Sequence, residues 1–268
     1  MRKIVILTAD ELRHDYFKLK FALEKDIHVL KTYCDITNKK YDLDNLDYSN
    51  IQNIHFCSRK QVEEDFFREF TSSAKDLSNS EYIKRGSINT EKYINEICEL
   101  NPDFIVAYGC CIIKPKLIEL FKNRIINVHL GLSPYYFGSG TNFHPFVNQE
   151  LSAVGATFMY MDAGIDTGNI IHQIRADIDT CDSIHQVGNR LIKKMTNVFI
   201  RLVKNFEKVK DIKQLSHEGG ITYKNKDCTP QSVEEAYKNI KNNLCAKYLK
   251  NKDNLDSEFP ISQQDFLC

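Results

Sequence analysis

Apolar runs of strand length alternate with amphipathic stretches along most of the chain. Residues 3–9 and 27–33 are apolar runs, and residues 11–24 between them carry apolar side chains at helical spacing. A strand, a helix and a second strand with short connections predict two parallel strands joined by a right-handed crossover. The first part of the chain therefore predicts an α/β fold.

The same alternation continues along the chain. Further strands are predicted over residues 103–108, 125–129, 153–161 and 169–175. Helices are predicted over residues 61–70, 90–100, 115–122, 183–206 and 233–249, and residues 138–149 turn and become helical. Residues 36–58 are polar and show no firm pattern. These elements predict a doubly wound α/β fold with a mostly parallel, Rossmann-like sheet.

The character of the sequence changes after Val209. Residues 211–229 are polar and turn-rich, the helix that follows has Ser232 as its expected cap, and the last residues are loosely patterned. We expect a catalytic domain over residues 1–208 and a small, mainly helical C-terminal appendage over residues 209–268.

Charge and hydropathy narrow the class of protein. The chain has 268 residues, with 36 basic and 36 acidic side chains. This balance gives no overall field that favours nucleic acid or an anionic membrane. No apolar run approaches the ~18 residues of a membrane span, and Asp10 and Glu11 follow the first run too soon for a signal peptide. We expect neither a nucleic acid nor a membrane as partner.

The nine cysteines are scattered, odd in number and without the paired spacing of a metal site. This pattern favours free thiols in a reducing cytoplasm over a disulfide framework or a zinc centre. We therefore expect a cytoplasmic protein without a bound metal, in which the adjacent Cys110 and Cys111 are core or near-core thiols.

Two short motifs carry the candidate chemistry. Asn127 and His129 end an apolar strand at alternate positions, so their side chains point the same way. Ligands of open α/β sheets bind outside the carboxyl ends of strands. The second motif, Asp162–Gly168, is an acidic, glycine-rich loop that contains Asp166. An amide, an imidazole and a carboxylate are the groups needed to stabilise an oxyanion and move one proton.

The residues alone leave other interpretations open. Asn127 and His129 can mark a strand that merely turns into a polar loop, and Asp166 can bond its own backbone in a turn. Asp166-Thr167-Gly168 also matches the signature of aspartic proteases, but it occurs once and the β-α-β pattern does not suit an all-β fold. A Rossmann-like oxidoreductase would carry Gly-x-Gly-x-x-Gly after the first strand, and this chain does not. A non-catalytic binding protein is a further alternative.

Five segments follow one another in a specific order, namely Ala107-Tyr108-Gly109, Asn127-Val128-His129, Leu132–Gly138, Gly155-Ala156-Thr157 and Asp162–Gly168. Their order and spacing resemble the folate-dependent formyltransferases, which include methionyl-tRNA, glycinamide ribonucleotide and sugar N-formyltransferases. The resemblance is strongest over residues 103–173. Two features depart from it, because Leu130-Gly131 stands where Pro-Ser is usual and Phe137 stands where arginine is common.

The resemblance implies transfer of a formyl group from 10-formyltetrahydrofolate to a primary amine, without a metal. Asn127 would donate a hydrogen bond to the developing oxyanion, and His129 would stabilise the same charge and help to move the proton. Asp166 would orient His129. The folate would lie against two segments, through Ala107, Tyr108, Gly109, Ile112, Ile113, Asp162, Gly164 and Ile165.

The resemblance also narrows the acceptor by elimination. The tRNA enzymes carry a C-terminal β-barrel domain and need positive potential, and the glycinamide ribonucleotide enzymes have a glycine-containing phosphate loop after the first strand. An amino sugar nucleotide is the leading acceptor, and a formyltetrahydrofolate hydrolase, with water as acceptor, is the alternative. A homodimer is compatible with this interpretation. The acceptor residues are expected to include Arg13, His14, Tyr135, Phe143 and His144.

Overall fold

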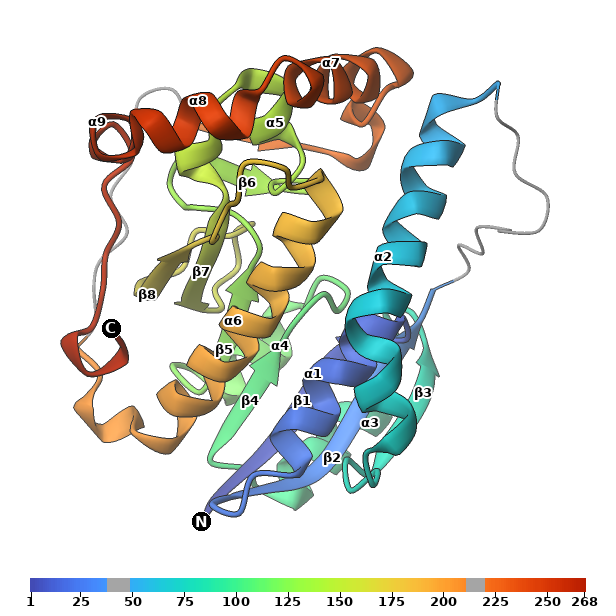
Figure 1. Cartoon of the computed structure of the whole chain (residues 1–268). Helices are drawn as coiled ribbons and strands as arrows, with labels where there is room; N and C mark the ends of the chain where they lie inside the picture. Colours follow the sequence, from blue (N-terminus) through green and yellow to red (C-terminus); the bar gives the residue numbers. More distant parts are fainter. Residues whose placement is uncertain (38–48, 211–219) are drawn as a thin grey trace.

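The computed structural model describes residues 1–37, 49–210 and 220–268. Its main feature is a seven-stranded sheet with the order β3-β2-β1-β4-β5-β7-β8 (Figure 1). The strands are β1 (Arg2–Ala9), β2 (Ile27–Ile36), β3 (Ser80–Lys84), β4 (Phe104–Ala107), β5 (Ile125–His129), β7 (Gly155–Tyr160) and β8 (Ile170–Arg175). Those from β3 to β5 are parallel, and β7 runs antiparallel to both β5 and β8. The predicted α/β fold with a mostly parallel sheet is confirmed.

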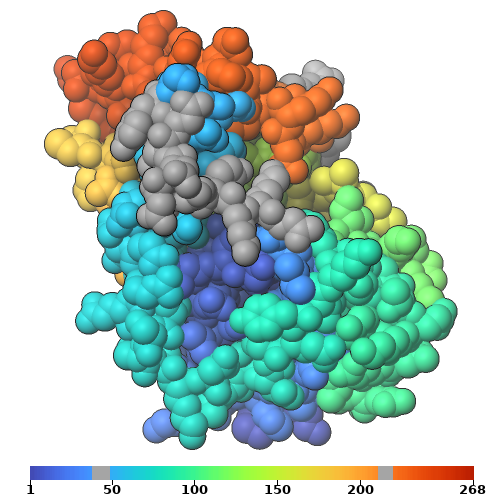
Figure 2. Space-filling view, turned by 90° about the vertical axis from the view of Figure 1, so that its right-hand side faces the viewer, coloured from blue at the N-terminus to red at the C-terminus, as the bar shows by residue number. Residues whose placement is uncertain are grey.

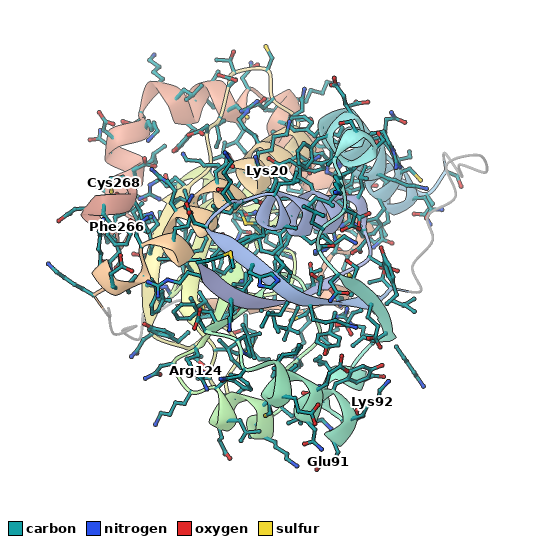
Figure 3. The ribbon with its side chains drawn as sticks, turned by 90° about the horizontal axis from the view of Figure 1, so that it is seen from below. Lys20, Glu91, Lys92, Arg124, Phe266 and Cys268 are labelled. Carbon is teal, nitrogen blue, oxygen red and sulfur yellow. The ribbon has the colours of Figure 1, made fainter. Side chains whose placement is uncertain are left out.

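Helices cover both faces of this sheet. One face carries α1 (Leu12–Ala22), α2 (Ile51–Ser73) and α6 (Ile184–Lys204), and the other carries α3 (Glu91–Leu100) and α4 (Pro115–Leu120). Figure 3 shows the sheet between α1, marked by Lys20, and α3, marked by Glu91 and Lys92. No helix among the residues described is both long and apolar enough to cross a membrane.

Strand β1 explains why the middle of the first apolar run, residues 4–7, has no polar position. Ile4 and Ile6 belong to the hydrophobic cluster that includes Phe199 of α6, whereas Val5 and Leu7 belong to the cluster on the opposite face. Side chains alternate along a strand, so a strand covered on both faces is apolar at every position.

The most strongly amphipathic stretch of the sequence forms α6, and its start is fixed by a capping box. The Ser183 hydroxyl accepts a hydrogen bond from the Gln186 N–H at 3.2 Å, and the Gln186 side chain accepts one from the Ser183 N–H at 2.9 Å. Two backbone donors that the helix cannot satisfy are thereby paired. The predicted bounds, residues 183–206, agree closely with the observed helix.

Several elements depart from the sequence pattern. Strand β3 was not predicted, and neither was the small parallel sheet of β6 (Tyr136–Gly138) and β9 (Ile221–Tyr223). These strands are short and partly exposed, so they lack an apolar run. Helix α2 begins at Ile51, well before the predicted start, because the Asn50 side chain accepts hydrogen bonds from two backbone N–H groups of its first turn. The rest of the unpatterned stretch lies largely outside the residues described.

The predicted helix over residues 233–249 is wrong as a single element. It consists of α7 (Pro230–Lys241) and α8 (Leu244–Lys250), followed by α9 (Lys252–Ser257). Asn243 between α7 and α8 has φ 61°, in the left-handed region, which no helix can pass through. The cap of α7 is Thr229 rather than Ser232, because the Thr229 hydroxyl accepts from the Ser232 N–H at 3.2 Å.

The C-terminal helices lie over α5 (His144–Asn148), at the top of Figure 1. Val233 and Ala236 of α7 and Tyr248 of α8 belong to the hydrophobic cluster that also contains the buried face of α6. The division of the chain at residues 208 and 209 stays a prediction, and these contacts show that residues after it share a core with those before it.

The segment after α9 runs along the outer edge of β8. The Gln173 N–H donates to the Ser262 carbonyl oxygen at 2.8 Å, and the Ser262 N–H donates to the Gln173 side chain at 2.9 Å. Further along, the Gln264 N–H donates to Nδ1 of His172 at 2.9 Å. This segment ends with Phe266 and Cys268, labelled in Figure 3, and it covers an edge strand that would otherwise present unpaired backbone groups.

Replacement of Asn239 by alanine should lower the free energy of unfolding by about 2 kcal/mol. The buried Asn239 amide donates to the carbonyl oxygens of Phe146 and Val147, both at 3.0 Å, so its removal leaves two acceptors of α5 unpaired. Urea unfolding measures the change. Lys238→Ala, an exposed change on the same helix, should shift stability by less than about 0.5 kcal/mol. Equal losses of unfolding free energy in the two variants would contradict the role assigned to the Asn239 amide.

Candidate functional site

A cavity of about 840 Å³ opens at the carboxyl ends of β1, β4 and β5. Its lining includes Ala9 at the end of β1, Tyr108 after β4, and Asn127 and His129 of β5. This is the position at which open α/β sheets bind ligands. In Figure 2, dark blue atoms of the N-terminal part lie recessed between the cyan and the green parts of the chain.

The structure brings His129 and Asp166 together in this cavity. His129 Nδ1 lies 3.3 Å from Asp166 Oδ2, and the other ring nitrogen, Nε2, lies 3.1 Å from the carbonyl oxygen of Tyr136. Carboxylate and carbonyl oxygens can only accept hydrogen bonds, so a proton on either ring nitrogen has a partner. The ring is held at both ends, with its orientation fixed.

The backbone conformation of the 162–168 loop orients the Asp166 carboxylate toward His129. Asp166 has φ 56°, in the left-handed region, and its Oδ2 also accepts a hydrogen bond from the Gly138 N–H at 2.9 Å. A Cβ on Gly168 would lie 1.7 Å from the Tyr160 carbonyl oxygen, so the loop needs glycine there. Asp162 accepts hydrogen bonds from the Gly164 N–H at 3.0 Å and the Thr167 hydroxyl at 2.9 Å, which closes the loop.

Asn127 lies two residues before His129 on β5 and lines the same cavity, as the strand alternation predicts. Its neighbours across the sheet are Ala107 on β4 and Met159 on β7. The amide, the imidazole and the carboxylate therefore come from one strand and one loop and meet at one site, where they can stabilise a developing oxyanion and move a proton.

Most residues expected to contact a folate line the cavity, namely Tyr108, Gly109, Ile112, Ile113, Asp162, Gly164 and Ile165. Gly109 has φ 66°, and a Cβ there would lie 2.3 Å from the His14 ring. Ile112 is 77% exposed and Ile165 is 55% exposed, so two apolar side chains lie near the entrance of the cavity. Ala107 is not among the lining residues; it is still inside the sheet with its side chain fully buried in the core, and its expected backbone contact with the folate stays a prediction.

Four of the five residues expected to bind the acceptor line the cavity: Arg13, His14, Phe143 and His144. The fifth, Tyr135, is not among the residues that line the cavity. Its hydroxyl donates to the Pro260 carbonyl oxygen at 2.8 Å, and its ring packs edge-on against Phe259, with the ring centroids 5.1 Å apart. The segment after α9 therefore buries Tyr135 away from the cavity.

Arg13 and His14 already have partners in this structure. The Arg13 guanidinium lies 2.8 Å from a Glu63 carboxylate oxygen and 3.2 Å from one of Glu11. His14 Nδ1 lies 2.8 Å from the Thr8 hydroxyl, and burial lowers the pKa of its imidazole. An anionic group that binds Arg13 must therefore compete with two carboxylates.

One wall of the cavity was missed by the sequence analysis. It is formed by His55 and Arg59 of α2, by Gly188 and Asn189 of α6, and by Asn142. These residues are far apart in the sequence and become neighbours only when α2 packs on α6. The one available sign was Gly188, a glycine inside a strongly amphipathic helical pattern.

Two buried histidines meet in this wall. The rings of His55 and His185 lie with their centroids 4.6 Å apart, and the Tyr237 hydroxyl lies 3.4 Å from His55 Nδ1 and 3.5 Å from His185 Nε2. Burial lowers the pKa of His55 to about 4 and that of His185 to about 3. Both imidazoles are therefore neutral at pH 7.

This burial predicts a loss of stability in acid. The unfolded chain binds a proton at each histidine below a pKa of ~6.5, whereas the folded protein keeps His55 and His185 neutral to a much lower pH. As the pH falls from about 6 to about 4.5, each of these two histidines should lower the free energy of unfolding by up to about 1.4 kcal/mol per pH unit. Urea unfolding of the double variant His55→Gln/His185→Gln should therefore show a shallower pH dependence.

The matched control for that experiment is His28→Gln, because His28 is exposed. It should leave the pH dependence of the wild type unchanged. A double variant that loses stability in acid as steeply as the wild type would contradict the assignment of the effect to His55 and His185.

Comparisons with known proteins agree with this geometry. The family model for formyl transferase matches residues 34–203, more than half of the chain, so the chain belongs to the formyl transferase family. It is 28% identical over 134 residues to a methionyl-tRNA formyltransferase of Finegoldia magna, across 49% of this chain and 43% of that protein. A second such enzyme, from Alkaliphilus oremlandii, is 36% identical over 118 residues, across 42% of this chain and 38% of that protein. The chain spans less than half the length of these curated relatives.

Solved structures share the fold. A 4-N formyltransferase from Francisella tularensis aligns with a TM-score of 0.56 and 19% identity, across 89% of this chain and 87% of that one. A phosphoribosylglycinamide formyltransferase from Anaplasma phagocytophilum aligns with a TM-score of 0.56 and 14% identity, across 84% of this chain and 100% of that one. At these identities the similarity establishes the fold.

Proposed function

We propose that this protein transfers a formyl group from 10-formyltetrahydrofolate to a primary amine. The observation that carries the proposal is the pairing of His129 with Asp166 beside Asn127, in a cavity at the carboxyl ends of the strands. In the reaction the amine nitrogen bonds to the formyl carbon, the bond from that carbon to N10 of the folate breaks, and the amine proton is transferred to N10.

Each residue of the triad has a role in this step. The Asn127 amide donates a hydrogen bond to the oxygen that becomes negatively charged in the tetrahedral intermediate. His129 stabilises the same charge and carries the proton released by the amine. Asp166 is a positioning residue, because its carboxylate faces His129 Nδ1 and is itself held by the Gly138 N–H.

Two glycine-containing segments, residues 108–113 and 162–168, line the cavity where the folate is expected to bind. Gly109 and Gly164 lie in these segments and line the cavity, and a Cβ at either position would collide with a neighbouring side chain, so both segments require glycine for their conformation. Ile112 and Ile165 add exposed apolar surface for an aromatic ring system. A formyltetrahydrofolate hydrolase, a nicotinamide-dependent oxidoreductase and a non-catalytic binder stay as alternatives for the tests below.

We infer that the acceptor is a small molecule, with an amino sugar nucleotide as the leading candidate. The charge of the chain is balanced, whereas phosphate contacts dominate the affinity of proteins for RNA. Methionyl-tRNA is the second candidate, because the curated relatives are named for it. The nine cysteines form no disulfide, which fits a reducing compartment such as the cytoplasm. A homodimer stays a prediction.

A formyl transfer assay tests this proposal. The protein is incubated with 10-formyltetrahydrofolate and one acceptor at a time, namely UDP- and dTDP-linked amino hexoses, methionyl-tRNA, or water alone. Mass spectrometry follows the formylated product, and absorbance follows release of tetrahydrofolate. Formylation of an amine supports the proposal. Release of formate at the same rate with and without an acceptor would identify a hydrolase and overturn it.

A further inference from the structure

The cavity extends beyond the triad into a part walled by helices. We call this part the helix lobe. It is lined by His55 and Arg59 of α2, by Ile184, His185, Gly188, Asn189 and Ile192 of α6, and by Asn142, Phe143 and His144 at the start of α5. None of the roles proposed above for the triad uses this lobe.

Gly188 keeps the helix lobe open. It lies inside α6, one turn after Ile184 and one turn before Ile192, and all three residues line the cavity. A Cβ at Gly188 would have no heavy atom within 4 Å, so alanine would fit at this position. Glycine inside a helix is less favourable than alanine. A ligand that packs directly on the α6 backbone explains why this weaker helix former stands here.

The helix lobe also contains polar groups for which the described residues provide no hydrogen-bond partner. Both polar atoms of the Asn142 side chain are buried without a hydrogen bond, as are Asn189 Nδ2 and His144 Nε2. The Asn189 and His144 side chains are each only 3% exposed. Buried polar groups are nearly always paired, so this many unpaired groups around one cavity point to a ligand that completes them.

The charge of the lobe limits what that ligand can be. Its three buried imidazoles, those of His55, His144 and His185, are neutral at pH 7 because burial lowers the pKa of each, and Arg59 already lies 3.6 Å from Glu63. The remaining groups are amides, which both donate and accept hydrogen bonds, and apolar side chains such as Phe143. This combination suits an uncharged ring that carries hydroxyl groups, because the amides bond the hydroxyls and the apolar groups contact the ring carbons.

We propose that the helix lobe binds the hexose ring of the acceptor over Gly188, with Asn142 and Asn189 as the residues that recognise its hydroxyl groups. The proposal rests on the proposed formyl transfer and deepens it, since it assigns the acceptor class to named residues. The rest of the acceptor, including its phosphates, lies outside this lobe, and the amine faces Asn127 and His129.

The test combines acceptor kinetics with two independent readouts. The acceptor is the best substrate among UDP- and dTDP-linked hexoses with an amino group on carbon 3 or carbon 4. Calorimetry measures the Kd for 5-formyltetrahydrofolate, and thermal unfolding measures the Tm. Gly188→Phe fills the lobe and should raise the acceptor KM at least tenfold, with the folate Kd within twofold of the wild type. Asn197→Phe, an exposed position on the same helix, is the matched control and should change neither.

Two variants with smaller changes of side-chain volume, Gly188→Ala and Asn142→Leu, keep the test decisive if Gly188→Phe does not fold. Gly188→Ala should raise the acceptor KM about threefold while the Tm stays equal or rises by a few degrees. Asn142→Leu should raise the acceptor KM about tenfold without lowering the Tm, because the amide it removes has no hydrogen-bond partner among the residues that the structure describes. If either residue does not contact the acceptor, its variant should leave the acceptor KM within twofold of the wild type.

The outcomes separate this inference from the proposed function. If the wild type binds no folate, the proposed function fails and the inference fails with it. If the wild type binds folate but formylates methionyl-tRNA and none of the amino hexoses, the inference alone is overturned. It is also overturned if an amino hexose is formylated and the folded Gly188 and Asn142 variants keep the acceptor KM within twofold of the wild type.

Discussion

Replacement of His129 by alanine is expected to lower kcat for formyl transfer about 100-fold or more, the usual contribution of a positioned acid–base group. The imidazole is held between the Asp166 carboxylate and the Tyr136 carbonyl oxygen. Alanine removes the group that stabilises the oxyanion and carries the amine proton. The protein should still fold, and the Kd for 5-formyltetrahydrofolate should change less than threefold, because the expected folate contacts come from other segments.

The matched control is His28→Ala, an exposed histidine outside the cavity, which should keep wild-type kcat. A His129→Ala protein with kcat within threefold of the wild type would remove this residue from the mechanism. A variant that no longer unfolds cooperatively is replaced by His129→Asn, which keeps a polar side chain but cannot shuttle the proton at neutral pH.

Replacement of Asn127 by alanine is expected to lower kcat about 10²- to 10³-fold, the typical cost of removing one donor to an oxyanion. The amide would act mainly in the transition state, so kcat and kcat/KM should fall together while the folate Kd stays within threefold. Asn127→Asp keeps the shape but replaces the donor by a negative charge, and it should be at least as slow. Steady-state kinetics with the best acceptor measures both variants.

Asn197→Ala on the exposed face of α6 is the control and should leave kcat unchanged. An Asn127→Ala protein whose acceptor KM rises while kcat stays at the wild-type value would contradict a transition-state role. It would assign the amide to ground-state binding instead.

The elements that the sequence predicts well are those in which one physical effect dominates. Strand β1 is covered on both faces, so its middle, residues 4–7, is an unbroken apolar run, and α6 combines a strong amphipathic pattern with the Ser183 capping box. The predictions fail where tertiary contacts, rather than the local sequence, determine which secondary structure forms. Strands β3, β6 and β9 are short and partly exposed, and the break between α7 and α8 depends on the left-handed backbone of Asn243.

The same distinction holds for the candidate site. Asn127 and His129 are predictable neighbours because strand geometry alone fixes which way they point, and the resemblance in motif order adds Asp166. The wall formed by His55 and Gly188 cannot be read from the sequence, since it requires α2 to pack on α6. Tyr135 is expected from the sequence to line the acceptor pocket, but the segment after α9 binds its hydroxyl, packs on its ring and buries it away from the cavity.

The most direct test of the central claim is a calorimetric titration of the purified protein with 5-formyltetrahydrofolate, a donor analogue that cannot transfer its formyl group. NAD and NADP are titrated in parallel. The proposed function predicts a Kd in the micromolar range for the folate and no measurable binding of either nicotinamide dinucleotide. Binding of NAD or NADP without binding of the folate would contradict it and leave only the shared fold.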